Sequence, residues 1–204
     1  ISPRDWSSDV CSSDLVSITQ HPAPDPAAHY RCTFHADRVC FDAAWPALQA
    51  HVTVWVSPED DIEFRQVELR NLGDRALDIE LISALEPTLA DPRADEAHPA
   101  FGNLFVGAQW HPGHRALLLE RTPRLPTEQR MQAAHFIADS DPQVVGLRCQ
   151  TDRQRWLGRN RSSNRPLASF DALPPASADG EPDALLLLDT GLDPVAALAV
   201  QLRI

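Results

Sequence analysis

Lysine is absent from this 204-residue chain, in which all eighteen basic residues are arginine. Eighteen arginines against 29 acidic residues give a formal net charge of −11. A chain this acidic is repelled by phosphate backbones and by anionic lipid surfaces, so we expect neither nucleic acid nor a membrane as a partner of this domain. The exclusive use of arginine most simply reflects a GC-rich genome.

Long apolar runs are also missing. No stretch approaches the roughly 20 apolar residues that a membrane-spanning helix needs, and the leucine run at residues 183–189 (DALLLLD) is short enough to indicate a buried strand. With 43% apolar residues, the chain is nevertheless long enough to bury a core of ordinary size. No signal peptide is visible, but we expect the natural sequence to be truncated upstream, so this absence carries no conclusion.

Cysteine is scarce, and its four positions fit neither a disulfide framework nor the spacing of a zinc site. Cys32 and Cys40 are eight residues apart on what we predict to be neighbouring strand segments, and Cys149 is remote. Cys11 lies in an atypical N-terminal segment. We expect buried free thiols, which fits a reducing compartment, and no metal or other cofactor.

The first fifteen residues differ from the rest of the chain. Residues 5–15 (DWSSDVCSSDL) lack apolar periodicity and resemble one translated frame of a common sequencing-library adapter. The alternative is a disordered polar N-terminus, because runs of Ser and Asp bury too little surface to fold. On either interpretation we set residues 1–15 aside and expect residues 16–204 to form a single β-sandwich domain, cut from a larger protein.

Short strands bounded by turn residues recur along the remainder of the chain. Predicted strands cover residues 51–56, 62–70, 76–85, 104–109, 116–121, 132–138 and 184–188. The sequence Asn71–Asp74 predicts a turn that makes the second and third of these strands partners. The apolar alternation changes parity between Phe64 and Val67, which suggests a bulge or twist. Many short strands without helical patterns between them predict an all-β, two-sheet antiparallel sandwich.

The core of this sandwich should contain the apolar residues of the strands. We expect these side chains to be largely buried: Val54, Ile62, Phe64, Val67, Leu69, Leu77, Ile79, Leu81, Phe105, Leu118, Phe136 and Leu187.

Two acidic groups could carry chemistry. Paired carboxylates serve glycoside cleavage, but Glu59, Asp60 and Asp61 lie at a strand entrance and are better explained as a solvated turn, because adjacent strand side chains point to opposite faces. The acids and single histidine of residues 91–98 have no recognised metal-ligand spacing. We interpret that segment as a shaped loop, stiffened by prolines and anchored in the core by Phe101.

The most function-like segment is residues 151–161 (TDRQRWLGRNR), where Gly158 allows a tight bend. Aromatic faces stack on sugar C–H surfaces, and arginines donate in a fixed fork to sugar hydroxyls or to phosphate. The alternative is that Trp156 and Leu157 anchor the core while the arginines pair with an acidic neighbouring surface. The arginines concerned are Arg153, Arg155, Arg159 and Arg161.

Three stretches, residues 56–83 (VSPEDDIEFRQVELRNLGDRALDIELIS), 97–106 (AHPAFGNLFV) and 151–161, together resemble a known family. They are similar, in this order and spacing, to the β-sandwich domain of glycoside hydrolase family 94 (also grouped as glycosyltransferase family 36), which includes cellobiose phosphorylase. The resemblance is closest to bacterial cyclic β-1,2-glucan synthases and extends from about Tyr30 to Leu198. It implies a large two-sheet supersandwich of the galactose-mutarotase-like type.

The resemblance also implies a function for the chain. The family's catalytic residues belong to an (α/α)6 helical barrel that this sequence does not contain, so we expect no catalytic residue here. The expected role is a non-catalytic, carbohydrate-associated domain that packs against the barrel of a parent glycosyltransferase or glycoside phosphorylase, with β-glucan as a possible ligand. Two alternatives stay open: a purely structural docking module without sugar contact, and a fragment with its own glycoside-cleaving activity.

Candidate residues for contact with sugar or with the barrel follow from the same resemblance: Arg153, Arg155, Trp156, Arg159, Arg161, His98 and Asn103. The sequence departs from the related synthases at two of these positions or beside them. Asn160 replaces a glycine typical of the family, and Trp156 replaces a phenylalanine. The expected location is the cytoplasmic face of a bacterial inner membrane, to which segments outside this sequence could anchor the parent protein.

Overall fold

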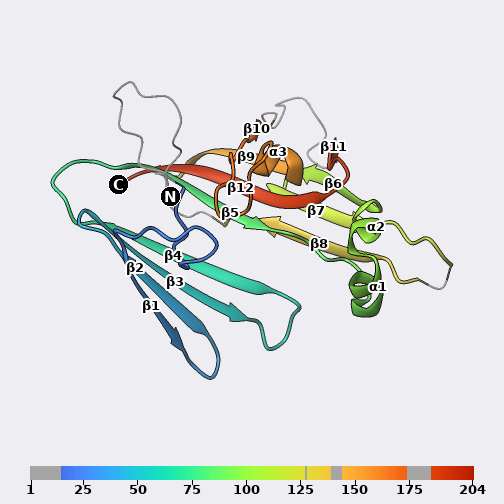
Figure 1. The fold of residues 1–204 in the computed structure, drawn as a ribbon, viewed down its shortest axis with the longest axis horizontal. Coiled ribbons are helices and arrows are strands. Elements are labelled where there is room, and N and C mark those ends of the chain that lie inside the picture. Colours follow the sequence, from blue (N-terminus) through green and yellow to red (C-terminus); the bar gives the residue numbers. More distant parts are fainter. Residues whose placement is uncertain (1–14, 127, 139–143, 174–184) are drawn as a thin grey trace. The chain divides into compact units, whose positions relative to one another are not determined.

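The structure is a computed structural model that describes residues 15–126, 128–138, 144–173 and 185–204. Strands dominate it, with only three short helices among the described residues, which confirms the all-β prediction (Figure 1). The chain divides into two compact units. The N-terminal unit comprises the described residues up to Leu81, Ser162–Arg165 and Gln201–Ile204, and the C-terminal unit comprises Ile82–Arg161 and Pro166–Val200. A single domain over residues 16–204 stays a prediction, and residues 1–14 of the segment set aside lie outside the described part.

The N-terminal unit is built on an antiparallel sheet whose strands follow one another in chain order. Its strands are β1 (His29–Phe34), β2 (Val39–Ala44), β3 (Leu48–Val56) and β4 (Glu63–Asn71). β3 and β4 pair residue by residue over their whole length, so the predicted bulge is wrong. The parity changes because this sheet carries apolar side chains on both faces. Phe64 shares a face with its cross-strand partner Trp55, whereas Val67 and Leu69 lie on the opposite face.

The inner face of this sheet forms the core of the N-terminal unit. Leu48 and Ala50 of β3 are buried in one cluster with Ile79, against which Leu69 packs. The predicted turn after β4 is present, since the Asn71 side chain accepts a hydrogen bond from the Gly73 amide at 2.9 Å. This turn shapes the chain locally as expected from its sequence.

The strand after this turn does not pair with β4, so the predicted hairpin is wrong. β5 (Asp78–Leu85) instead neighbours β12 (Pro194–Arg203) in a second sheet. This sheet also contains β9 (Val145–Asp152) and β10 (Asp171–Ala172), in the order β10-β9-β12-β5. The connection between β4 and β5 is longer than a two-residue hairpin loop. Its last residue, Leu77, is hydrogen-bonded to a distant part of the chain. Backbone hydrogen bonds join Leu77 to Ile204 in both directions, at 2.9 and 3.1 Å. Pairing with the distant C-terminal strand therefore replaces the expected local partner.

The C-terminal unit has a sandwich core. The third sheet contains β6 (Val106–His111), β7 (Ala116–Arg121), β8 (Met131–Phe136) and β11 (Leu186–Leu188), in the order β11-β6-β7-β8. One buried cluster combines residues of this sheet, such as Trp110 and Leu117, with residues of β9 and β12, such as Cys149 and Leu198. Side chains from two sheets in one cluster mean that the sheets pack face to face.

β12 is buried on both of its faces. Ala196 and Leu198 face the cluster just described, whereas Val195 and Ala197 belong to a second cluster with Trp156 and Leu157. A strand covered on both sides has an almost continuous apolar sequence, here PVAALAV, without the alternation that marks a half-buried strand.

Most of the predicted core residues are buried or half-buried, but four are not. Ile62, Phe64, Phe136 and Leu187 are 40%, 39%, 53% and 83% exposed. Leu187 is the middle residue of β11, and its neighbours on either side are the ones that pack inward. The described part of the leucine run is therefore a strand with one inward face, and the prediction that it is a buried strand is wrong for Leu187.

The three described cysteines are free, as predicted, but they differ in burial. Cys149 is buried, Cys40 is half-buried, and Cys32 is exposed, so the prediction of buried thiols is wrong for Cys32. Cys32 and Cys40 lie on the paired strands β1 and β2, which confirms that they occupy neighbouring strand segments. Cys11 lies outside the described residues.

Candidate functional site

The arginine-rich segment begins as a short helix, α3 (Arg153–Leu157), directly after β9. Asp152 caps this helix, because its carboxylate accepts hydrogen bonds from the amides of Gln154 at 2.8 Å and Arg155 at 3.3 Å. Gly158 ends the helix with φ of +80°, and a Cβ there would lie 3.0 Å from Leu167. The predicted bend at this glycine is confirmed.

Trp156 and Leu157 lie in the core of the C-terminal unit. Each is 8% exposed, and both pack with Val195 and Ala197 of β12. The Trp156 ring meets Phe170 edge to face, with centroids 5.4 Å apart. The tryptophan side chain is thus used for packing, as the core alternative predicted.

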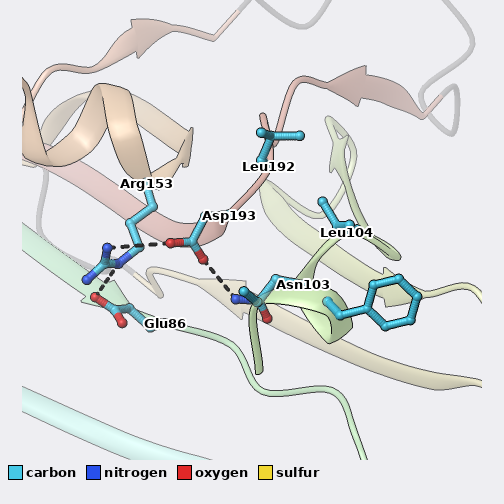
Figure 2. A pocket seen from close by; sticks show the side chains of 8 residues that line it. Glu86, Asn103, Leu104, Arg153, Leu192 and Asp193 are labelled. Atoms are coloured by element: carbon cyan, nitrogen blue, oxygen red, sulfur yellow. Dashed lines mark hydrogen bonds and ion pairs between the residues drawn. The ribbon is translucent and has the colours of Figure 1, made fainter. Parts of the chain in front are cut away.

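Arg153 is the arginine that the fold fixes in place. Its Nε donates to Glu86 at 2.8 Å, and its guanidinium also lies 3.4 Å from the Asp193 carboxylate. Asn103 donates to the other oxygen of Asp193 at 2.8 Å. Glu86 follows β5, Arg153 begins α3, Asp193 precedes β12, and Asn103 ends the second short helix. The four side chains form one continuous network of ion pairs and hydrogen bonds (Figure 2).

This ion-pair network has an electrostatic consequence. The hydrogen bond to Glu86, more than the charge of Asp193, raises the pKa of Arg153 further above its ordinary value. The guanidinium stays charged at any accessible pH. Arg153 is half-buried and has two carboxylate partners. Because it stays charged, its ion pairs with Glu86 and Asp193 persist over the whole physiological pH range.

The network forms the polar part of an open cleft of about 630 Å³. Its other side is apolar, and Phe101, Leu104 and Leu192 are exposed there by 46%, 50% and 67%. Figure 2 shows Leu104 and Leu192 near the paired Arg153 and Asp193. We call this feature the Arg153 cleft; it is lined by Glu86, Ala100, Phe101, Asn103, Leu104, Arg153, Leu192 and Asp193.

The predicted loop before β6 is two short helices, α1 (Pro92–Ala97) and α2 (Pro99–Asn103), each beginning at a proline. The prediction that Phe101 anchors this segment in the core is wrong, because its ring lies at the surface. It contacts Phe105 edge to face at 5.3 Å, and the Arg124 guanidinium lies 4.5 Å from its centroid. An aromatic ring held between a second ring and a cation is fixed in position while staying accessible.

The structure brings together only part of the predicted set of candidate residues. Arg153 and Asn103 share the cleft, whereas Arg155 is exposed and pairs with Asp171 at 2.7 Å. Arg159 and Arg161 are exposed beyond the end of α3. His98 is exposed between α1 and α2.

The other cleft residues were missed by sequence analysis. Glu86 and Asp193 each stand directly before a proline at a strand boundary, which is the one local signal they share. Leu104 is the first residue of the strand predicted at 104–109, but β6 begins only at Val106, and Leu192 is a single apolar residue after the last predicted strand. Nothing in the local pattern separates either side chain from a core residue.

The two acidic groups considered above are surface features. Glu59, Asp60 and Asp61 are exposed, and the Ser57 hydroxyl accepts hydrogen bonds from the amides of Glu59 and Asp60 at 3.2 and 3.1 Å. This is the solvated turn that the sequence favoured. Within the described residues, no group of three metal-ligating side chains is close enough to hold an ion.

Chemically, the Arg153 cleft is suited to contact. Each ionisable side chain that lines it takes part in the same network of ion pairs, so the network presents fixed hydrogen-bonding groups at the surface. The exposed apolar side chains beside this network offer a surface that a second macromolecule or a sugar ring could cover.

Comparison with known proteins decides the family. A family model for the glycosyl hydrolase 94 supersandwich domain matches residues 8–204. The chain belongs to this family. The matched range begins inside the segment that we set aside, and it confirms the resemblance inferred from the three stretches.

One curated relative is similar over nearly the whole chain. It is the cyclic β-(1,2)-glucan synthase NdvB of Rhizobium meliloti (strain 1021), 29% identical over 196 residues. The aligned region is 96% of this chain but 7% of that protein, so the chain spans a small part of its relative's length. Among the described residues, no helix is long and apolar enough to cross a membrane.

Proposed function

We propose that the chain is a non-catalytic domain of a cyclic β-1,2-glucan synthase or a related glycoside phosphorylase. It packs against an (α/α)6 catalytic barrel of the same parent protein and helps to frame the region where glucan is processed. The observation that carries this proposal is the Arg153 cleft, a fixed ion-pair network beside three exposed apolar side chains. The parent enzyme would work at the cytoplasmic face of a bacterial membrane.

The composition of the cleft favours a protein partner. Interface centres are enriched in aromatic residues and arginine, and they bury apolar side chains that the free domain exposes. Phe101, Leu104 and Leu192 provide such side chains within one lining. Arg153 is already oriented by its carboxylates, so docking would cost little additional side-chain entropy.

A sugar contact at the same cleft is the second candidate function. Asn103 and Arg153 could donate to hydroxyl groups, and the accessible Phe101 ring could stack on a sugar face. Arg155, Arg159, Arg161 and His98 remain candidates for wider contacts around the cleft. Trp156 is the weakest candidate, because its ring is committed to the core.

The first experiment measures association between this chain and the separately expressed barrel of its parent protein. Leu104→Asp places a charge in the apolar lining and should weaken association at least tenfold, because burying an unpaired charge is unfavourable. The matched control is Leu72→Asp, since Leu72 is 49% exposed, close to the 50% of Leu104, but belongs to the N-terminal unit.

The result depends on both variants keeping their fold. Leu104→Asp and Leu72→Asp are surface changes and should melt within error of the parent chain. If Leu104→Asp binds the barrel as well as the control does, the cleft is not the docking surface. A sugar role of the cleft is tested by Asn103→Ala in the free chain: it should weaken binding of β-1,2-glucan oligosaccharides, whereas a cleft that only docks the barrel leaves that binding unchanged.

A further inference from the structure

The outer face of the sheet β1–β4 is an organised polar surface with an aromatic end. Cross-strand pairing places Asp42, His51 and Glu68 in one row. The next row towards the β3–β4 turn contains Thr53 and Gln66. This face is opposite to the one that carries the buried core of the N-terminal unit, because strand side chains alternate.

Trp55 and Phe64 form the row nearest the turn. Their rings are parallel within 15°, with centroids 5.0 Å apart. Phe64 is 39% exposed and Trp55 is half-buried, so the pair presents aromatic surface to solvent. Each ring also supports the other, which fixes its orientation with little mobility.

The polar rows are held in place by hydrogen bonds among themselves. His51 Nδ1 lies 2.7 Å from Asp42, and its Nε2 lies 3.1 Å from the Thr53 hydroxyl. The Gln66 amide donates to Glu68 at 3.2 Å. Planar polar groups that are already oriented can bind hydroxyl groups at a low entropic cost. With a rise of about 3.3 Å per residue, the row of His51 lies about 13 Å from the aromatic pair.

Charge selects the class of ligand. The chain as a whole is strongly acidic, but on this face the arginines at 31 and 70 balance Asp42 and Glu68. A balanced surface attracts neither a polyanion nor a polycation, whereas a neutral polymer with many hydroxyl groups matches it. A flat row of sites about 13 Å long fits a chain of sugars better than a single one.

We propose that the outer face of the sheet β1–β4 binds a neutral glucan chain. The Trp55–Phe64 pair stacks against the C–H face of one sugar, and the side chains of His51 and Gln66 bind hydroxyl groups of the sugars that follow. The choice of β-1,2-glucan among neutral glucans rests on the proposed function. The site is separate from the Arg153 cleft and lies in the other unit.

Titration of linear β-1,2-glucan oligosaccharides into the purified chain, followed by calorimetry, tests this inference. Trp55→Ala and Phe64→Ala should each weaken binding at least tenfold, as expected for loss of one stacked ring. Phe34→Ala is the matched control: Phe34 is 82% exposed in the same sheet, and its pairing places it on the opposite face. Its affinity for glucan should equal that of the unchanged chain.

Further variants keep the result interpretable. If Trp55→Ala does not fold, Gln66→Ala removes a polar contact without touching the aromatic pair, and it should also weaken binding. Lack of measurable binding by the unchanged chain at millimolar glucan overturns the inference, as does equal binding by Phe34→Ala, Phe64→Ala and Gln66→Ala. Barrel association, measured as above, is unaffected by either outcome, so failure of the glucan site is distinguishable from failure of the proposed function.

Discussion

Replacing Trp156 by alanine tests whether the arginine-rich segment is scaffold or contact surface. Trp156 is 8% exposed, and its indole packs edge to face on Phe170 and against Val195 and Ala197 of β12. The substitution should therefore create a cavity beside the doubly buried strand. Arg159→Ala is the control in the same segment, because Arg159 is exposed.

The expected cost follows from the buried surface. A tryptophan side chain removes about 150–250 Å² from water, which at about 25 cal/mol per Å² is about 4–6 kcal/mol. The alanine side chain keeps part of this burial free energy, whereas the cavity left behind adds to the cost. We therefore expect the substitution to lower the free energy of unfolding by about 3–5 kcal/mol. For a chain of this length each kcal/mol lowers Tm by about 2–4 °C. The melting temperature should fall by roughly 6–20 °C.

Urea unfolding followed by far-UV circular dichroism measures this cost without depending on the fluorescence of the residue removed. Arg159→Ala should change the free energy of unfolding by no more than about 0.5 kcal/mol. A cost below about 1 kcal/mol for Trp156→Ala would refute the packing argument. If that small cost came with weaker barrel or glucan binding, Trp156 would be a contact residue instead.

Three further predictions concern the backbone, the thiols and activity. Gly191→Ala should destabilise by about 1–2 kcal/mol or more, because Gly191 has φ of +58° and a Cβ would lie 2.8 Å from the Asp152 carboxylate that caps α3. Gly102→Ala, where a Cβ meets nothing within 4 Å, is the control and should be neutral or slightly stabilising by denaturant unfolding. Burial, with a smaller effect of a nearby carboxylate, raises the pKa of Cys149 from 9.0 to about 11, so at pH 8 a thiol reagent should label the exposed Cys32 in the native chain and Cys149 only after unfolding. The pKa of Cys149 is higher in the folded chain than in the unfolded chain. The neutral thiol therefore contributes stability that is fully present below pH 9 and is lost as pH rises towards 11. Urea unfolding at several pH values would detect this loss. Finally, the isolated chain with phosphate and β-1,2-glucan should release no glucose 1-phosphate; turnover that survives rigorous purification would contradict this.

Local patterns were sufficient where one face of a strand is buried and the other is not. The predicted strand at residues 51–56 lies within β3, where Leu48, Ala50 and Val52 are buried and the residues between them are not. The same rule misled at Phe64, because an aromatic residue on an outer face looks like a core residue in sequence. Only the cross-strand partner, Trp55, explains why an apolar side chain is there.

The sequence did not predict elements whose apolar residues lack a regular spacing. β12 is apolar on both faces, so its sequence lacks the alternation that is present in β3. The strand ranges predicted from the sequence also did not include β9. The three helices are five or six residues long, too short for a helical period, and two of them depend on caps from Asp91 and Asp152. These short helices are the elements that carry Asn103 and Arg153.

The cleft itself depends on contacts between distant parts of the chain. Glu86 and Arg153 are 67 residues apart, and Asn103 and Asp193 are 90 apart. No spacing along the sequence encodes these pairs. They form because β5 and β9 are brought to either side of the C-terminal strand β12, which sequence analysis had not identified.

The two proposed surfaces can be separated by experiment because they belong to different units of the chain. Leu104 belongs to the C-terminal unit and Trp55 to the N-terminal unit. Changes at independent sites add in free energy. A chain that carries both Leu104→Asp and Trp55→Ala should therefore lose barrel association as the first variant does and glucan binding as the second does. Losses larger than these would mean that the two surfaces are energetically coupled, so that they could not be treated as independent sites.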